Sequence, residues 1–255
     1  MRRFFISPEQ LNLPRPFIGG DDARHLRTVL RLKPGDMIAV LDGKGHEYQA
    51  RIVSMDGERV YVALEAAVMK ETESAVEIVL AQGYLKDKKM DDLIRPLTEL
   101  GITRWIPFLA ARSVPAPNEK KMLVRQARWR KLSQEAVKQC GRQRPMHIEP
   151  VMRFEEALHQ ARSCDLKLLF WERSAESRKV EPHWTRQPSM LFIMIGPEDG
   201  FEPHEVDSAR QEGFLVVGMG PRILRAQTAA LSAAVIAQFV FGDMHQNFLD
   251  NPQVV

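Results

Sequence analysis

Several features that define common protein classes are missing from this 255-residue chain. Its two cysteines, Cys140 and Cys164, form neither a CxxC pair nor a disulfide framework. Its seven histidines are scattered singly, without the spacing of metal ligands, so a metal enzyme is not expected. No stretch provides the roughly 18 uninterrupted apolar residues of a membrane span, and the first residues lack the apolar core of a signal peptide. We therefore expect a protein of the reducing cytoplasm with no membrane partner.

The net charge is only +3, but positive charge is concentrated in one block of the chain. Residues 84–144 contain 15 Lys and Arg against 6 Asp and Glu, whereas residues 145–255 contain 10 against 15. Such a block favours a polyanionic partner, because neutralising phosphates releases counterions. A solvated basic helix face is the alternative explanation.

The N-terminal part of the chain has the pattern of a small β-rich module. Strands are predicted at Met37–Leu41, Glu47–Val53 and Val60–Leu64, separated by turns that contain Asp-Gly. A helix is predicted over Ala23–Leu32, with Asp21 or Asp22 as its cap. Surface arginines occur on any helix, but here they also favour an RNA-binding module, and the candidates are Arg2, Arg3, Arg24 and Arg31.

Beyond a polar stretch near residue 72, apolar runs alternate with helical patterns. The alternation predicts a parallel sheet covered by helices. Lys88 and Lys89 follow its first strand, and Arg142 and Arg144 lie in a polar loop suited to phosphates and base edges. The predicted strands are Val76–Gln82, Trp105–Leu109, Leu166–Trp171, Leu191–Ile195 and Phe214–Val217. The predicted helices are Lys86–Gly101, 118–140, Phe154–Ala161, Pro203–Glu212 and Ala226–Phe241.

Two of the predicted strands end abruptly in glycine and proline. Leu191–Ile195 runs into IGPEDGF, and Phe214–Val217 runs into GMGPRIL. Glycine at the carboxyl end of a parallel strand lets a ligand lie against bare backbone, so we expect the functional site here. A nicotinamide-dependent oxidoreductase is a weaker alternative, because Ile223 replaces the third glycine of the GxGxxG fingerprint.

Five motifs, in order along nearly the whole chain, resemble the ribosomal RNA small-subunit methyltransferase E family of the SPOUT superfamily. They are HLRTVLRLKPGD at His25–Asp36, ELGITRWIPF at Glu99–Phe108, EAVKQCGRQRP at Glu135–Pro145, IGPEDGF at Ile195–Phe201 and GMGPRILRAQTAA at Gly218–Ala230. The resemblance implies an α/β protein: a PUA-like RNA-binding β-barrel at residues 1–72, then a SPOUT methyltransferase domain with a deep C-terminal trefoil knot at residues 73–255. It also implies a homodimer, with Ala226–Phe241 serving both the core and the dimer contact.

The same resemblance implies a cofactor, S-adenosylmethionine, and a substrate, N3 of a uridine in 16S ribosomal RNA. Arg222 or Arg225 is expected to stabilise charge that develops on the uracil, and Glu198 to accept the N3 proton or orient the base. Another RNA such as tRNA, or a non-catalytic RNA-binding role, is the alternative. Cofactor contacts are expected from Leu169, Trp171, Glu172, Ile195, Gly196, Pro197, Gly200, Val217, Met219, Gly220, Ile223 and Leu224.

Two positions depart from the family pattern. Asp199 stands where a glycine is usual, and Gln227 stands where a glutamate is usual. Because aspartate tolerates turn geometry less well than glycine, and glutamine lacks the charge of glutamate, we expect these changes to alter cofactor affinity or rate.

Overall fold

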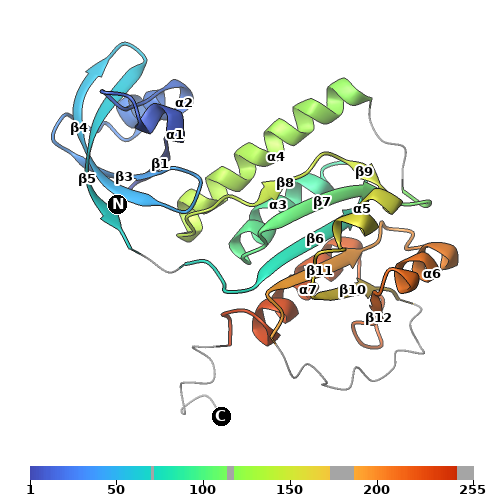
Figure 1. Ribbon diagram of the computed structural model, residues 1–255. Coiled ribbons are helices and arrows are strands. Elements are labelled where there is room, and N and C mark those ends of the chain that lie inside the picture. The colour runs from blue at the N-terminus through green and yellow to red at the C-terminus, as the bar shows by residue number, and fades with distance from the viewer. Residues whose placement is uncertain (70–71, 114–117, 173–186, 246–255) are drawn as a thin grey trace. The chain divides into compact units, whose positions relative to one another are not determined.

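The chain forms two compact units in a computed structural model that describes residues 1–69, 72–113, 118–172 and 187–245 (Figure 1). Unit 1 contains Met1–Glu73 and Gln134–Pro145. Unit 2 contains Ser74–Ser133 and Met146–Val255. Among the described helices, none combines the length and the apolar composition needed to cross a membrane.

Unit 1 is built on a five-stranded sheet. Its strands are β1 (Arg3–Phe5), β2 (Phe17–Ile18), β3 (Met37–Leu41), β4 (Glu47–Asp56) and β5 (Arg59–Val68). The order across the sheet is β1-β3-β4-β5-β2, and β3, β4 and β5 form an antiparallel meander. Alternate residues of these strands, such as Ile38, Val40 and Ile52, enter one apolar core with Leu26. Period-two alternation therefore produces the predicted β-rich module.

The predicted helix of unit 1 is present but irregular. A short helix, α1 (Pro8–Leu11), precedes it, and α2 (Gly20–Arg24) continues directly into a π-helical turn, η1 (His25–Val29). The N-cap is Gly19, so the prediction of Asp21 or Asp22 as the cap is wrong. Both carboxylates lie inside the first turn, where they interact favourably with the helix dipole.

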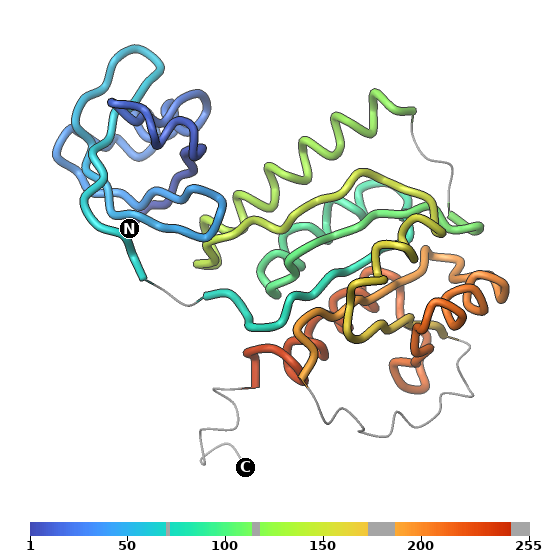
Figure 2. The backbone as a smooth tube through the Cα atoms, in the orientation of Figure 1, coloured from blue at the N-terminus to red at the C-terminus, as the bar shows by residue number. Residues whose placement is uncertain are grey.

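Unit 2 is a parallel sheet with helices on both faces (Figure 1). The strand order is β12-β10-β11-β6-β7-β8, and β9 also pairs with β7. Figure 2 follows the chain through this sheet, in which orange β11 lies beside cyan β6 although the two are far apart in sequence. The strands are β6 (Glu77–Gly83), β7 (Arg104–Leu109), β8 (His147–Ile148), β9 (Met152–Arg153), β10 (Leu166–Phe170), β11 (Met190–Ile195) and β12 (Leu215–Val217).

Five helices are found in the described part of unit 2, and the last residues of one of them, α4, belong to unit 1. They are α3 (Lys89–Glu99), α4 (Glu119–Cys140), α5 (Phe154–Gln160), α6 (Pro203–Gln211) and α7 (Ala226–Val240). Each strand and helix predicted from Val76 onward is confirmed, with ends that differ by three residues or fewer. Among the described elements of unit 2, β8 and β9, two residues each, were not predicted.

The two faces of the sheet have separate apolar cores. Leu191 and Ile193 of β11 pack in the core that contains α3 and α7, whereas Phe192 and Met194 pack in the core of α5 and α6. Both faces are buried, so the strand sequences are continuous apolar runs. This arrangement leaves the carboxyl ends of β10, β11 and β12 side by side, because β10 pairs in parallel with both neighbours.

Candidate functional site

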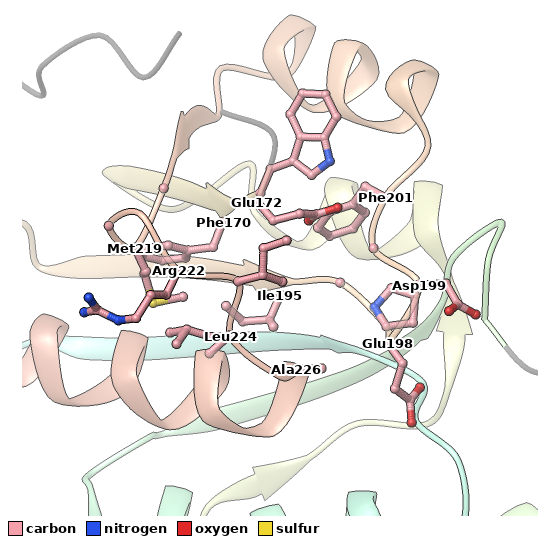
Figure 3. A pocket seen from close by; sticks show the side chains of 18 of the residues that line it. Phe170, Glu172, Ile195, Glu198, Asp199, Phe201, Met219, Arg222, Leu224 and Ala226 are labelled. Atoms are coloured by element: carbon pink, nitrogen blue, oxygen red, sulfur yellow. The ribbon is translucent and has the colours of Figure 1, made fainter. Parts of the chain in front are cut away.

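A cavity of about 620 Å³ opens at the carboxyl ends of β10, β11 and β12 (Figure 3). Three segments line it: 170–172, the first turn (Ile195–Phe201) and the second turn (Gly218–Leu224), together with Ala226 and Ala229 of α7. Its volume is typical of small-molecule sites. The cavity lies where the two glycine turns predicted a ligand.

Ten of the twelve predicted cofactor residues line this cavity. The exceptions, Leu169 and Val217, are buried in the sheet immediately before the lining segments. Glu198 and Arg222, predicted as catalytic, also line the cavity, and the other lining residues are neighbours of predicted ones in sequence or lie on the first turns of α7. They are Phe170, Asp199, Phe201, Gly218, Pro221, Ala226 and Ala229.

The backbone of the first turn is held tightly from β6. Gln82 is fully buried, and its Nε2 donates to the Gly196 carbonyl at 3.1 Å. A Cβ on Gly83 would lie 2.4 Å from the backbone nitrogen of Pro197, so no side chain fits there. Phe201 ends the turn and stacks on Phe108, with ring centroids 6.2 Å apart. Sequence analysis missed Gln82 and Gly83, which lie one strand away from the turn.

Glu198 is an ionised carboxylate fixed by two donors. It accepts hydrogen bonds from the Lys86 backbone N–H at 3.1 Å and from Lys89 Nζ at 3.0 Å. Burial by itself raises the pKa of Glu198, but these hydrogen bonds and the charge of Lys89 lower the pKa by more, so it lies below the usual glutamate value. In Figure 3 the side chain extends away from Ile195 at the centre of the view. A carboxylate with a lowered pKa is a weak base, which favours an orienting role.

Asp199 does not strain the first turn. The positive φ of this turn, 71°, belongs to Gly200 and not to Asp199, so the position of Asp199 does not require the backbone freedom of glycine. Its carbonyl accepts from Arg112 Nη1 at 3.0 Å, and Arg112 Nε donates to Glu202 at 2.7 Å. The carboxylate of Asp199 remains exposed at the rim of the cavity.

The second turn is open by comparison. A Cβ on Gly220 would meet no atom within 4 Å, and Ile223 is 81% exposed. Arg222 is exposed and forms no hydrogen bond or ion pair with any described residue. Its guanidinium lies at the opposite end of the cavity from Glu198 and Asp199 (Figure 3).

Arg225 and Gln227 follow the second turn but do not line the cavity. Arg225 is the N-cap residue of α7 and is exposed. Gln227 Nε2 donates to the Lys89 carbonyl at 3.4 Å. Lys89 is thus linked to the first turn, through its side chain to Glu198, and to the start of α7, through its carbonyl to Gln227.

Trp171 lines the cavity, and its indole nitrogen is an unpartnered polar atom. Trp171 Nε1 is buried and donates to no described residue. Buried N–H groups are nearly always satisfied, so this donor is a candidate partner for an acceptor of a bound ligand. Ile195, Met219 and Leu224 supply apolar surface in the same cavity.

Two of the predicted RNA-binding arginines have structural roles inside unit 1. Arg3 pairs with Glu47 at 2.6 Å, and Arg142, only 5% exposed, pairs with Glu73 at 2.6 Å. Their guanidinium groups form ion pairs within the fold, which argues against contacts between these two side chains and RNA. Lys89 is engaged with Glu198. The remaining candidates are exposed, and they are Arg2, Arg24, Arg31, Lys88 and Arg144.

Comparison with known families defines the class of the protein. Residues 72–238 match the family described as RNA methyltransferase domain, and residues 18–65 match the RNA methyltransferase PUA domain. The protein is therefore an RNA methyltransferase of mixed α/β fold with an N-terminal PUA-like domain, as predicted.

Individual relatives narrow the class to one family. The chain is 30% identical over 241 residues to ribosomal RNA small subunit methyltransferase E of Bacillus subtilis, covering 91% of this chain and 94% of that one. It is 28% identical to the protein of the same name from Synechocystis, covering 89% and 74%. The Neisseria gonorrhoeae protein of that name, solved bound to S-adenosyl methionine, superposes with a TM-score of 0.83 at 29% identity, covering 96% and 99%. The chain belongs to the ribosomal RNA small subunit methyltransferase E family, which confirms the resemblance of its motifs.

Proposed function

We propose that this protein uses S-adenosylmethionine to methylate N3 of a uridine in 16S ribosomal RNA, in the cytoplasm. The family and the solved relative with its bound cofactor support the reaction class. The observation that carries the proposal is the cavity, whose walls are the two glycine turns and whose ends differ in charge. Carboxylates of Glu198 and Asp199 lie at one end, and Arg222 lies at the other (Figure 3).

The lining residues fit S-adenosylmethionine by their chemistry. Apolar side chains such as Ile195 and Leu224 suit an adenine ring, and the carboxylates of Glu172 and Asp199 complement a sulfonium or ammonium group. The unpartnered N–H of Trp171 provides a donor for an acceptor atom of the cofactor. When bound, the cofactor supplies an activated methyl group.

The residues around the cavity act mainly by positioning and by charge. Uridine N3 lies on the pairing edge, so the base must be unpaired when it enters. Loss of the N3 proton to solvent water leaves negative charge on the uracil carbonyls. Arg222, exposed at the rim and without a described partner, stabilises that charge, whereas Arg225 lies outside the lining. Glu198, held by Lys86 and Lys89, orients the base and is not the proton acceptor.

We also propose that the C-terminal part of unit 2 forms a trefoil knot and that α7 mediates a homodimer. The support for the dimer is an exposed apolar strip near the end of α7, where Val235, Ile236, Phe239 and Val240 are 40–46% exposed. Sedimentation equilibrium is expected to show a dimer that the double substitution Ile236→Asp, Phe239→Asp converts to monomers. Val53→Asp, at an exposed valine of unit 1, is the matched control and leaves the dimer intact. A wild-type protein that sediments as a monomer would overturn the dimer.

The reaction is tested with small ribosomal subunits and RNA from cells that lack this protein. The full chain is incubated with them and S-adenosylmethionine that carries a deuterated methyl group, and nuclease digests are analysed by mass spectrometry. We expect one labelled N3-methyluridine per 16S molecule. Label in tRNA alone would show that the substrate is tRNA and not 16S ribosomal RNA. RNA binding with no label transfer, and no heat with S-adenosylmethionine in calorimetry, would overturn the enzymatic proposal.

A further inference from the structure

The first half of α4 is divided into a buried side and a basic exposed side. Gln126, Trp129, Leu132 and Ser133 are buried, and they recur at the spacing of one helix face. Between Lys120 and Lys131 the sequence contains no acidic residue. The exposed basic residues of this stretch are Lys120, Lys121, Arg128, Arg130 and Lys131.

Folding does not account for this exposed side. Arg128 pairs with Asp91 at 2.9 Å, but the side chains of Lys120, Lys121 and Arg130 form no ion pair with any described residue. Leu123 and Val124 lie on the same side and are 61% and 67% exposed. A helix face with uncompensated positive charge and exposed apolar side chains is suited to a binding partner.

α4 is attached to the loop that supports the cavity. Arg125 donates to the Tyr84 hydroxyl and to the carbonyl of Asp87, a residue in the left-handed region with φ of 57°. The same loop supplies the Lys86 N–H that holds Glu198. Lys88, which follows Asp87 in this loop, adds an exposed positive charge between the contacts with α4 and with Glu198.

We propose that the exposed side of α4 in unit 2, residues 119–133, binds the sugar-phosphate backbone of the substrate RNA and leads the strand to the cavity. This inference rests on the proposed function and adds a substrate-binding surface to it. Lys120 to Lys131 spans about 16 Å of helix rise, enough for several phosphates of one strand. The target base must be unpaired, and Leu123 and Val124 provide apolar contact for exposed bases beside it.

The test compares a variant that lacks three positive charges on α4 with a variant that lacks three positive charges elsewhere in unit 2. The α4 variant is Lys120→Gln, Lys121→Gln, Arg130→Gln. Its control is Arg153→Gln, Arg162→Gln, Arg210→Gln, three exposed arginines from the α5 and α6 side of unit 2. RNA affinity is measured at several salt concentrations by filter binding, with S-adenosylmethionine affinity measured by calorimetry.

We expect the α4 variant to bind the RNA at least about tenfold more weakly, with the slope of log Kd against log salt reduced by about 2. The control keeps the wild-type affinity and slope, and both variants keep the cofactor affinity. If the α4 variant and wild type have equal RNA affinity and an equal slope of log Kd against log salt, the inference is overturned. In that case, methylation of RNA by wild type still supports the proposed function. Failure of wild type itself to methylate RNA instead counts against the proposed function.

Leu123→Ser, Val124→Ser separates RNA contact from protein contact on this surface. We expect it to weaken RNA binding about threefold, leave the salt slope unchanged and leave sedimentation of the free protein unchanged. A change in sedimentation without any change in RNA affinity would assign the surface to a protein partner and overturn the inference.

Discussion

The two turns that enclose the cavity are supported very differently. The first turn receives hydrogen bonds from Gln82, Lys89 and Arg112, and its backbone approaches Gly83 too closely for any side chain. The second turn leaves open space around Gly220 and exposes most of its side chains. One wall of the site is therefore preorganised by the fold, whereas the other has few contacts of its own.

The difference indicates a division of labour. A wall fixed by buried contacts costs little to order when a ligand binds, so the first turn and its surroundings suit the cofactor, which binds in every cycle. An open wall with an unpaired cation suits a group that meets the RNA only when the substrate arrives. Substitutions in the first turn are then expected to affect stability and cofactor affinity, and substitution of Arg222 in the second turn to affect the chemical step.

The largest effect is expected at Arg222 in the second turn. Arg222→Ala should lower the single-turnover methylation rate about a hundredfold with saturating cofactor, because one preorganised charge at the reacting group contributes about 3 kcal/mol. Arg222 has no described partner, so the free energy of unfolding and the cofactor affinity should not change. Arg225→Ala, outside the cavity lining, is the control and should cost much less. Equal losses for the two variants would contradict the assignment.

Gly83→Ala tests the rigidity of the first turn. Its Cβ would lie 2.4 Å from the Pro197 nitrogen and 2.8 Å from the Gly196 carbonyl carbon, so the first turn must shift. We expect a loss of about 2 kcal/mol in the free energy of unfolding and weaker cofactor binding, measured by urea denaturation and calorimetry. Gly220→Asn in the second turn, at φ of 82° with no atom within 4 Å, meets only the cost of a left-handed backbone and should lower stability by about 1 kcal/mol, less than Gly83→Ala. A larger loss of stability for Gly220→Asn than for Gly83→Ala would contradict the view that the first turn is the rigid wall of the cavity.

The same contrast explains what could be predicted from the sequence. Strand and helix positions in unit 2 follow from apolar runs and glycine boundaries, and the turns themselves are sequence-local, so most lining residues were found. The supports of the first turn were missed because Gln82 lies 114 residues from Gly196 in sequence. Periodicity carries no information about contacts of that separation.

The positions of basic residues in the sequence were the least reliable predictor of functional residues. Arg142 and Arg144 stand in the same polar loop, and the sequence alone does not distinguish them. Arg142 is buried against Glu73, whereas Arg144 is exposed. An arginine in a polar loop can be a fold contact or a ligand contact, and only its distant partner decides which it is.

A substitution at Trp171 tests cofactor binding in the cavity, and its expected effect is smaller. Trp171→Phe removes a buried donor that has no described partner, so we expect cofactor affinity to fall about fivefold, or about 1 kcal/mol. Trp105→Phe is a matched control, because Trp105 Nε1 is also buried without a described partner but lies in the α3 and α7 core, outside the cavity. Both variants lose similar ring volume. Calorimetry that shows the same loss of cofactor affinity for both would contradict a donor role for Trp171.

Glu198 is expected to give the smallest effect, and it tests whether the rigid turn takes part in proton transfer. Its pKa is lowered, so the ionised form stabilises the fold above the unfolded-state pKa, and this contribution is lost as pH falls through the lower folded-state value. The pair with Lys89 is partly exposed, at 23% and 41%, which limits the contribution to about 0.5 kcal/mol. Glu198→Gln should therefore be slightly less stable than wild type in urea at neutral pH and equal to it in strong acid.

The methylation rate of Glu198→Gln decides whether Glu198 orients the base or accepts its proton. Glutamine still accepts a hydrogen bond from the Lys86 N–H but cannot take a proton, so an orienting residue predicts a rate within about threefold of wild type. A general base predicts a loss of about a hundredfold or more. Single-turnover rates measured across neutral pH also separate them, because a carboxylate with a lowered pKa stays ionised throughout that range and adds no acidic limb to the profile. A hundredfold loss would make the first turn catalytic and end the division of labour between the two turns.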